Sequence, residues 1–461
     1  MMQQTAALLA SLDSELGPGG VLTGETIGAR YHSDWTRLNA CPPAAVLRPR
    51  STEEVATILR RCHGVSQPVV IQGGLTGLAG GATPRPGELS LSLERLSGIE
   101  AIDVDGGTVC VRAGTLLAAI HEAVAGHGLQ FALDLPARGS CQIGGNIATN
   151  AGGNRVIRYG MTRALVLGLE AVLADGTVLS SMNSMLKNNA GYDLKQLFIG
   201  TEGTLGVVTR AVLRLHPAPR DRLTALVAIP SFTGLVAVLH EVSAALGGQL
   251  GSFEVMWSDY YEFAASKVLT GPRPFAARHP YYALVELEAL EPAGDSERFE
   301  TLLAQLIEDG FATDAVLARS LEDSARLWRV RESAGELMMH LMPVTAYDIS
   351  LPIARMDDYL QAIGRATAPL LREFPLFIFG HLGDGNLHIV AAAKAAADVR
   401  ALDALIYGAL EGFGSVSAEH GIGVLKRGYL GMSRGPAEIT LMRTLKATLD
   451  PRNILNPGRV L

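Results

Sequence analysis

The chain has 461 residues, of which 48% are hydrophobic and 51 are glycine, so its length predicts more than one folded domain. A formal net charge of −7 argues against nucleic acid and against an electrostatically held membrane surface as partners. Four cysteines without a C-x-x-C pair are typical of reduced thiols, which predicts a cytoplasmic protein. The most apolar long window, 223–239, contains Pro230 and Gly234, so no transmembrane helix is expected, and residues 1–16 predict an amphipathic helix rather than a signal peptide.

The first half of the sequence predicts short strands and helices separated by three glycine-rich stretches. A strand over 44–47 precedes a helix whose N-cap is Ser51 or Thr52. Further strands are expected over 69–71, 89–93, 99–104, 108–111, 223–229 and 282–288, and further helices over 115–126, 232–246 and 296–309. The glycine-rich stretches cover 73–81, 136–153 and 188–206, and Pro217-Ala-Pro219 marks a domain boundary.

These glycine-rich stretches predict a binding site for a large anionic cofactor. Glycine lets backbone N–H groups approach and wrap a pyrophosphate, although ordinary tight turns also use glycine. None of the three stretches fits the G-x-G-x-x-G or the G-x-x-x-x-G-K-[ST] pattern, so a standard NAD or ATP site is not expected. A cofactor contacted by several loops is the better interpretation.

A histidine pair in the segment 381–388 predicts a metal site. The apolar run before it and the Asp384-Gly385 turn inside it are typical of a β-hairpin. Centring the turn on these two residues pairs His381 with His388, with Cβ atoms about 5 Å apart on one face. Glu419 could add a carboxylate ligand, which gives a set suited to Zn²⁺, with Mn²⁺ or Fe²⁺ as alternatives. The ordinary alternative is that two histidines flank a turn by coincidence.

Taken together, the motifs resemble one family from about residue 40 to the C-terminus. They are 73–81, 139–153, Arg158-Tyr-Gly160, 189–194, 200–206, both histidine motifs and 450–458. The chain is similar to the FAD-linked oxidoreductases of the vanillyl-alcohol oxidase / p-cresol methylhydroxylase family, in the D-lactate / D-2-hydroxyglutarate dehydrogenase branch. The resemblance implies an α+β fold with a two-subdomain FAD-binding domain (1–218), an antiparallel-sheet cap domain carrying the histidines (219–410), and a C-terminal segment (411–461) that returns to the FAD domain.

The resemblance also assigns the cofactor contacts. Residues 73–81 would hold the FAD pyrophosphate, 139–153 would line the isoalloxazine and ribityl chain, and 200–206 would complete the cleft. The residues expected to contact FAD are Gly73, Gly74, Leu75, Thr76, Gly77, Leu78, Gly80, Gly81, Pro136, Gly139, Ser140, Gly144, Gly145, Asn146, Ala148, Thr149, Gly152, Gly153, Arg158, Tyr159, Gly160, Glu202, Gly203, Gly206, Val207 and Asn456. The first loop has no histidine, so the FAD is expected to be non-covalent.

Oxidation of a 2-hydroxy acid needs a base, a cation for the carboxylate and a hydride acceptor. His420, beside Glu419, has an unperturbed pKa near 6.5 that suits a general base, and an orienting hydrogen bond is its alternative role. Arg331 matches the family position for the substrate carboxylate, with a surface ion pair as the alternative. Asn386 could bind the substrate oxygens or serve only the turn.

The substrate prediction rests on departures from the family. Hydroxyglutarate-selective relatives place a hydroxyl and a lysine where Gly335 and Ala346 stand. Met338, Met339 and Met342 lie nearby and either belong to a helix core or make the pocket apolar. The sequence therefore favours D-lactate or another D-2-hydroxy acid with an apolar substituent, with D-2-hydroxyglutarate as the alternative.

Two other classes stay open at the level of the sequence. One is a flavin-binding subunit that relays electrons in a larger, glycolate-oxidase-like complex, and the other is a metal hydrolase without flavin. The electron acceptor is open between an electron-transfer flavoprotein, a quinone and a cytochrome. The oligomeric state is also open, with a homodimer among the arrangements considered.

Overall fold

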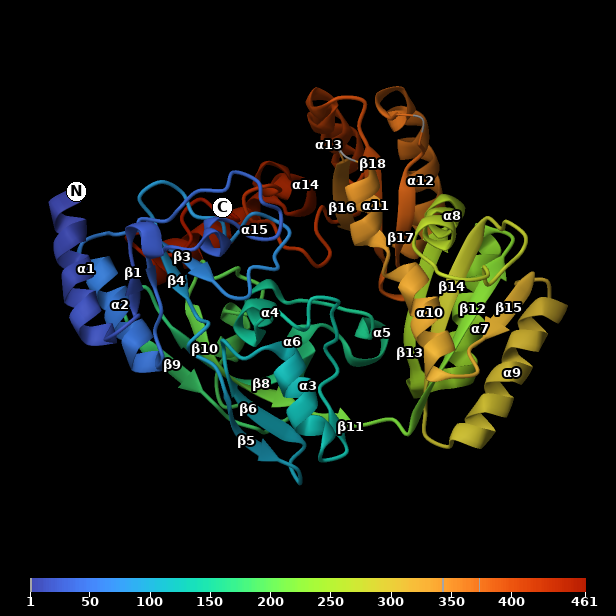
Figure 1. Cartoon of the computed structure of the whole chain (residues 1–461), viewed down its shortest axis with the longest axis horizontal. Helices are drawn as coiled ribbons and strands as arrows, with labels where there is room; N and C mark the ends of the chain where they lie inside the picture. Colours follow the sequence, from blue (N-terminus) through green and yellow to red (C-terminus); the bar gives the residue numbers. More distant parts are fainter. Residues whose placement is uncertain (1, 342–343, 373) are drawn as a thin grey trace. The chain divides into compact units, whose positions relative to one another are not determined.

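The computed structural model describes residues 2–341, 344–372 and 374–461, which form two compact units (Figure 1). Unit 1 comprises 1–153, 160–218 and 419–461, and unit 2 comprises 154–159 and 219–418. The division after Ala218 coincides with the expected boundary, whereas 154–159 and 411–418 belong to unit 2. The backbones of Ser350 and Ser415 exchange two hydrogen bonds of 3.1 and 2.7 Å, which attaches the second of these segments to unit 2.

Unit 1 contains two larger sheets and one short ladder. The four-stranded sheet has the order β1-β2-β4-β3, in which β2, β4 and β3 run parallel. The five-stranded sheet has the order β5-β6-β10-β8-β9 and is antiparallel throughout. The strands are β1 (Val21–Leu22), β2 (Ala45–Leu47), β3 (Val69–Gln72), β4 (Leu89–Ser92), β5 (Ile99–Asp103), β6 (Thr108–Arg112), β7 (Leu129–Gln130), β8 (Val166–Val172), β9 (Val178–Ser181), β10 (Val207–Arg214) and β11 (His216–Pro217).

The helices of unit 1 follow the capping rules of the sequence. Ser51 is the N-cap of α2 and its hydroxyl accepts a hydrogen bond from the backbone N–H of Glu54, which decides between the two expected caps. The helices are α1 (Met2–Leu16), α2 (Thr52–Gly64), α3 (Leu117–Ala125), α4 (Ile143–Thr149), α6 (Thr162–Leu165), α14 (Leu430–Ser433) and α15 (Pro436–Leu449), with 3₁₀ turns η1 (Gly24–Thr26), η2 (Ala29–His32), η3 (Leu194–Leu197) and η8 (Arg427–Tyr429).

Unit 2 is built on one seven-stranded sheet, and every neighbouring pair in it is antiparallel. Its order is β15-β12-β14-β13-β17-β18-β16. The strands are β12 (Asp221–Ile229), β13 (Leu250–Trp257), β14 (Tyr281–Ala289), β15 (Asp314–Leu317), β16 (Val344–Ser350), β17 (Phe377–His381) and β18 (Asn386–Ala392). The expected antiparallel-sheet domain is therefore confirmed.

Helices connect the strands of unit 2. Helix α9 begins four residues before the expected start, at Pro292, because proline suits the first turn of a helix. The helices are α5 (Val156–Tyr159), α7 (Phe232–Leu246), α8 (Ser258–Lys267), α9 (Pro292–Glu308), α10 (Leu321–Arg331), α11 (Ala334–Leu341), α12 (Ile353–Thr367) and α13 (Val399–Gly408), with 3₁₀ turns η4 (Gly247–Gln249), η5 (Ala368–Leu370), η6 (Leu382–Asp384) and η7 (Ala396–Asp398). None of the helices in the described ranges combines the length and the hydropathy needed to cross a bilayer.

One face of the unit 2 sheet changes from apolar to polar along its strands. Its apolar end packs against α8, α10 and α11 in a buried cluster that includes Met256, Leu284, Phe377, Phe379 and Val390. Side chains on a strand return to the same face every second residue. The same face therefore next carries the polar side chains Glu254, Glu286, His381 and His388. The polar end of this face positions the candidate site.

Candidate active site

A cavity of about 1100 Å³ in unit 1 is the first component of the candidate site. Gly73, Gly74 and Leu75 of the first glycine-rich stretch line it together with Ser140 and Gln142 of the second. The sequence predicted that these two stretches meet at one cofactor. It did not predict the segment 29–40, which contributes Arg30, His32, Asp34, Trp35 and Arg37 to the same cavity.

The first glycine loop needs its glycines for close packing. A Cβ at Gly74 would overlap the Ser140 carbonyl oxygen and lie 2.8 Å from the Cys141 Cα, so the two stretches touch through backbone here. Leu75 follows with a φ of 59°, a left-handed conformation that a leucine rarely adopts. Such backbone strain gathers at binding sites, where the surrounding structure holds it in place.

Adjacent glycines in α4 face different surroundings. A Cβ at Gly144 would lie 2.7 Å from the Ala113 Cβ, whereas a Cβ at Gly145 would meet nothing within 4 Å in the described chain. A Cβ built on Gly73 would be in van der Waals contact with the Gly145 Cα at 3.6 Å, so the first glycine loop passes close to the backbone of α4. Gln142, before this helix, has a buried Oε1 without a hydrogen-bond partner among the described residues. A glycine-walled cavity with an unpaired acceptor fits FAD, whose ribityl hydroxyls and ring N–H can donate hydrogen bonds.

The third glycine-rich stretch has a different role, because its Glu202 binds protein backbone. The two carboxylate oxygens accept hydrogen bonds from the N–H groups of Ile422 and Gly423, at 2.7 and 2.8 Å. Burial raises the pKa of Glu202, while these two backbone amides and Lys426 act in the opposite direction. Glu202 therefore holds the residues that directly follow Glu419 and His420.

The C-terminal segment packs on unit 1 through Asn456. Its Oδ1 accepts from the N–H of Ile71 at 2.8 Å, and its Nδ2 donates to the carbonyl oxygen of Glu202 at 2.5 Å. These two bonds join β3, which leads into the first glycine loop, to the third glycine-rich stretch. The expected direct contact of Asn456 with FAD stays a prediction, since its described bonds are to backbone.

In unit 2 the register of the histidine hairpin differs from the predicted one. His381 pairs with Asn386, and His388 pairs with Phe379. The turn is the 3₁₀ turn η6 closed by Gly385 at a φ of 79°, so it is longer than the Asp384-Gly385 turn assumed from the sequence. The pairing is shifted by two residues, which preserves the face, and the two imidazole centroids lie 5.4 Å apart.

Each histidine has a buried carboxylate near its Nδ1 atom. Glu254 on β13 lies 2.7 Å from His381 Nδ1, and Asp348 on β16 lies 3.9 Å from His388 Nδ1. Sequence reasoning missed both carboxylates. The available signal was a lone acidic residue inside an apolar strand, since an acidic side chain is rarely buried unless it is paired. With Nδ1 of His381 bound to Glu254, Nε2 is the atom that would bind a metal, and here it lies 3.5 Å from Arg331 Nη2.

Arg331, at the end of α10, is buried and already bound to a carboxylate. Its Nε and Nη2 lie 2.8 and 2.7 Å from Glu254 Oε2, and its guanidinium lies over the Phe379 ring. Burial opposes the charge on Glu254, but the neighbouring His381 and Arg331 lower the pKa of this carboxyl overall. Arg331 is thus not a surface ion pair, which was the alternative role.

Asn386 lies at the start of β18, and its amide nitrogen is fully used in hydrogen bonds within unit 2. Its Nδ2 donates to Asp348 Oδ1 and to the Ile349 carbonyl oxygen, both at 2.9 Å. Its Oδ1 is buried without a partner in the described chain, so the atom left for a ligand is an acceptor. Asp348 in turn accepts from the N–H of Ala418 at 3.2 Å, and Glu419 and His420 follow Ala418 directly in the chain.

Two expected cofactor residues, Arg158 and Tyr159, belong to unit 2, whereas Gly160 belongs to unit 1. Arg158 Nη1 and the Tyr159 hydroxyl lie 2.9 and 2.5 Å from Glu288 Oε2, and Arg155 pairs with the same carboxylate at 3.3 Å. Burial and the Glu288 hydrogen bond both raise the pKa of Tyr159. These contacts anchor 154–159 to the sheet, and a FAD contact by Arg158 or Tyr159 stays a prediction.

The positions from which the sequence predicted substrate choice, Gly335 and Ala346, lie in α11 and β16 of unit 2. A Cβ at Gly335 would meet nothing within 4 Å in the described chain, and Ala346 pairs with Val390 across β16 and β18. Met338 packs against the buried cluster of unit 2, and Met339 is 74% exposed. Met338 therefore belongs to the helix core, the first of the two roles considered for these methionines. Met342 lies outside the described residues.

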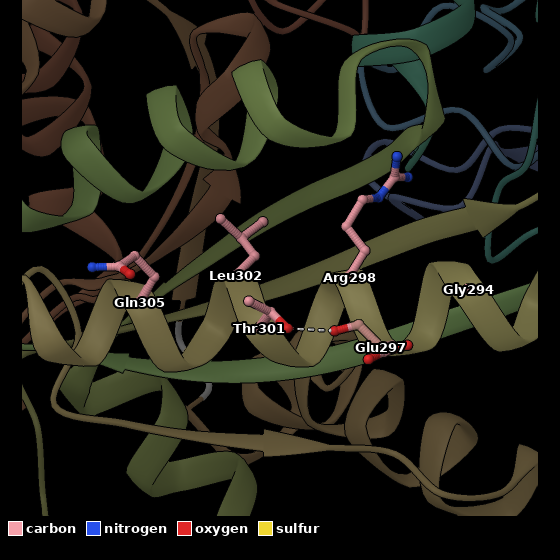
Figure 2. Close-up of a pocket in the computed structure, with 6 residues that line it drawn as sticks. All are labelled: Gly294, Glu297, Arg298, Thr301, Leu302 and Gln305. Atoms are coloured by element: carbon pink, nitrogen blue, oxygen red, sulfur yellow. Dashed lines mark hydrogen bonds between the residues drawn. The ribbon is translucent and has the colours of Figure 1, made fainter.

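A second hollow, on unit 2, has no features of a site. Figure 2 shows that its six lining residues, Gly294, Glu297, Arg298, Thr301, Leu302 and Gln305, all come from α9. The Thr301 hydroxyl donates to the Glu297 carbonyl oxygen, an ordinary bond along one helix turn. Residues of a single helix face do not converge on a ligand, so we assign no role to this hollow.

Comparison with known proteins agrees with this geometry. The family model described as FAD binding domain matches residues 43–181, and the model described as FAD linked oxidases, C-terminal domain, matches residues 218–460. The chain belongs to the FAD-linked oxidases. It binds FAD through the first of these domains, which removes the flavin-free hydrolase from consideration.

Relatives of this FAD-linked oxidase cover nearly its whole length. The mitochondrial D-2-hydroxyglutarate dehydrogenase of Bos taurus is 40% identical over 98% of this chain and 83% of its own. The D-2-hydroxyglutarate dehydrogenase of Xanthomonas citri pv. viticola is 42% identical over 93% of this chain and 92% of its own. The expected branch, a FAD-dependent 2-hydroxy-acid dehydrogenase, is confirmed.

Solved structures with the same fold are also found. The structure of p-cresol methylhydroxylase with substrate bound matches all of the chain and 97% of its own, with a TM-score of 0.76 and 16% identity. An alkyldihydroxyacetonephosphate synthase matches 98% of the chain and 84% of its own, also with a TM-score of 0.76 and 16% identity. At this identity the likeness concerns the fold alone.

Proposed function

We propose that this FAD-linked oxidase oxidises a D-2-hydroxy acid with a small or apolar C2 substituent to the 2-oxo acid. The observation that carries the proposal is the polar face of unit 2, where the buried carboxylate of Glu254 contacts both His381 and Arg331, and His388 lies beside His381. Two imidazoles and a guanidinium suit a substrate that offers a hydroxyl and a carboxylate on adjacent carbons. When bound, FAD supplies the hydride acceptor and a divalent metal supplies Lewis acidity.

His381, His388 and Glu419 would hold the metal. The donor chemistry fits, because neutral imidazoles and one carboxylate are ligands that Zn²⁺, Mn²⁺ and Fe²⁺ accept. His381 and His388 belong to unit 2, and the chain reaches Glu419 directly after Ala418, whose N–H binds Asp348. Zinc is the first metal to test.

His420 would take the hydroxyl proton of the substrate. It adjoins Glu419, and Glu202 fixes the backbone immediately after it through Ile422 and Gly423. A held backbone gives the imidazole a defined position, which a general base requires. Arg331 would bind the substrate carboxylate through Nη1, since Glu254 occupies Nε and Nη2. Before His420 takes the hydroxyl proton, the acceptor Oδ1 of Asn386 would orient that hydroxyl by accepting its hydrogen bond.

The substituent on C2 would meet uncharged groups. Among the described residues Gly335 leaves open space, and Ala346 and Val390, paired across two strands, bring no polar side-chain atom. A distal carboxylate would lack the hydroxyl and the lysine that the hydroxyglutarate-selective pattern provides at these positions. Because Ala346 is exposed, such a carboxylate would stay hydrated and gain no binding energy from a partner there, which supports a small or apolar substituent.

D-2-hydroxyglutarate is the second candidate substrate, and the names of the relatives at 40% and 42% identity favour it. The test is anaerobic reduction of the flavin, followed by steady-state kinetics with D-lactate, longer apolar D-2-hydroxy acids, D-2-hydroxyglutarate and their L-enantiomers. We expect the apolar D-acids to give a kcat/KM at least tenfold above that of D-2-hydroxyglutarate. The opposite ratio would establish the second candidate instead. A flavin that none of these acids reduces in the isolated chain would favour the electron-relay subunit.

The remaining parts of the proposal concern the cofactor and the partners. Non-covalent FAD is expected to stay in the supernatant after acid precipitation, because the first glycine loop has no histidine. The acceptor is proposed to be an electron-transfer flavoprotein, a quinone or a cytochrome. Turnover with each acceptor, at equal enzyme concentration, distinguishes them.

A further inference from the structure

We propose that Glu254 is a positioning residue that sets both the metal-binding atom of His381 and the orientation of Arg331. The inference rests on the metal site of the proposed function and names a residue outside its ligand set. Glu254 lies on β13 and pairs with His381 on the neighbouring strand β17. The carboxylate of Glu254 therefore contacts both a proposed metal ligand, His381, and the proposed substrate-binding cation, Arg331.

The contacts of Glu254 account for both of its oxygen atoms. Oε1 lies 2.7 Å from His381 Nδ1, and Oε2 lies 2.8 and 2.7 Å from Arg331 Nε and Nη2. The side chain of Glu254 is 1% exposed, and those of His381 and Arg331 are each 8% exposed. Water is thus largely excluded, and the three groups determine one another's hydrogen bonding.

The carboxylate decides which imidazole nitrogen carries the proton. An ionised carboxylate only accepts hydrogen bonds, so His381 Nδ1 must donate its proton to Glu254. In the neutral imidazole the other nitrogen, Nε2, is then unprotonated. It faces Arg331 Nη2 at 3.5 Å, as an acceptor can, and it is the atom that would bind a metal. Without this acceptor the tautomer with the proton on Nε2 becomes available, and that tautomer cannot bind a metal through Nε2.

Arg331 is held by the same carboxylate, by the ring of Phe379 and by the hydroxyl of Tyr260. Its guanidinium carbon lies 4.9 Å from the Phe379 ring centroid, and its carbonyl oxygen accepts from the Tyr260 hydroxyl at 2.7 Å. Tyr260 in turn stacks on Phe379, with ring centroids 4.3 Å apart. Nε and Nη2 bind Glu254, and Nη2 also lies 3.5 Å from His381 Nε2, so the guanidinium is held in one orientation with Nη1 directed away from these two groups.

Two variants of Glu254 distinguish a residue that only stabilises the fold from one that positions His381. The two roles predict opposite orders of Zn²⁺ affinity for Glu254→Gln and Glu254→Ala. In Glu254→Gln, the amide oxygen is needed by Arg331, so the amide NH₂ group faces His381 Nδ1. That nitrogen must then accept a hydrogen bond, and its proton moves to Nε2. Glu254→Ala leaves Nδ1 without an enforced partner, so both tautomers are accessible. The nearly isosteric glutamine is therefore expected to be more harmful to metal binding than alanine.

The experiment measures Zn²⁺ affinity by competition with a chromophoric chelator, on FAD-loaded wild type and variants. We expect the affinity to fall in the order wild type, Glu254→Ala, Glu254→Gln, with a loss of 10- to 100-fold for glutamine, as is typical when the partner of a metal-bound histidine is removed. Glu286→Gln is the matched control. Glu286 is a buried carboxylate on the neighbouring strand β14, bound to Arg155 and Trp328 at 3.0 Å each, and its replacement should leave Zn²⁺ affinity within threefold.

The outcomes separate this inference from the proposed function. Wild type that binds neither Zn²⁺ nor Mn²⁺ would overturn the metal site and the inference together. Wild type that binds Zn²⁺ while Glu254→Gln binds it equally well would overturn the inference alone. If Glu254→Gln loses less Zn²⁺ affinity than Glu254→Ala, Glu254 contributes to stability only. If Glu254→Ala does not fold, the inference is tested by comparing the Zn²⁺ affinities of Glu254→Gln and Glu286→Gln.

Discussion

Gly144 and Gly145 are neighbours in α4, but a Cβ atom would have different surroundings at the two positions. At Gly144 the absent Cβ allows the helix to touch Ala113, 2.7 Å from the built position to the Ala113 Cβ. At Gly145 a Cβ would meet nothing within 4 Å in the described chain. Gly144 therefore serves the packing of unit 1, whereas the open space at Gly145 is available to the FAD that the sequence predicts beside it.

Alanine at these two positions should separate stability from cofactor binding. We expect Gly144→Ala to lower the thermal midpoint of the FAD-free protein, because overpacking is destabilising. Gly145→Ala should keep or raise that midpoint, since alanine in a helix is up to about 1 kcal/mol better than glycine. The same variant should weaken FAD binding at least tenfold in a flavin fluorescence titration. Unchanged FAD affinity in Gly145→Ala would show that the cofactor does not pass this helix.

At the level of elements, three segments distant in sequence meet around Glu202. Its carboxylate binds the backbone of Ile422 and Gly423, and a Cβ built on Gly81 would lie 3.3 Å from its Oε2. The carbonyl oxygen of Ala79 accepts from Val424 and Leu425 at 2.9 and 3.2 Å. The first glycine loop, the third glycine-rich stretch and the segment after His420 therefore form one hydrogen-bonded unit inside unit 1.

Replacing Glu202 should affect His420 more than FAD. In Glu202→Gln one of the two amides loses its acceptor, so we expect faster hydrogen exchange at Ile422 or Gly423 and a kcat at least tenfold lower. FAD affinity should change less than threefold, because the carboxylate contacts backbone. Glu438→Gln is the control, since Glu438 accepts from the exposed N–H of Gly435 at 2.9 Å and should leave kcat unchanged. A main effect on FAD affinity would restore the direct cofactor contact predicted from the sequence.

At the level of the whole molecule, the two units carry different parts of the chemistry. Unit 1 contains the cavity that fits FAD, and unit 2 contains both histidines and Arg331. The three tryptophans are divided in the same way. Trp35 lines the cavity of unit 1, whereas Trp257 and Trp328 lie in unit 2, so their fluorescence reports on each unit separately.

Cofactor binding should therefore stabilise the units unequally. A ligand present at a hundred times its Kd adds about 2.7 kcal/mol to the state that binds it. In a Trp257→Phe, Trp328→Phe variant, we expect FAD to quench Trp35 and to raise its thermal midpoint. In Trp35→Phe, the fluorescence of unit 2 should show a smaller shift. Equal shifts in both variants would mean that the two units unfold as one.

Much of the site was predictable because its signals are local in sequence. The glycine-rich stretches and the histidine hairpin are read within a few residues, and capping places α2 after Ser51. The hairpin register was wrong by two residues, since η6 lengthens the turn. The two histidines still share a face, because a strand repeats every two residues and an even shift preserves that alternation.

The sequence by itself determined the family motifs, the element types and the candidate ligands His381, His388 and Glu419. Only the tertiary structure decided which carboxylates stand behind those ligands. Glu254 lies 127 residues before His381 in the chain and reaches it because β13 pairs with β17. No local pattern encodes that pairing, since the choice of neighbouring strand depends on how the whole sheet buries its apolar face.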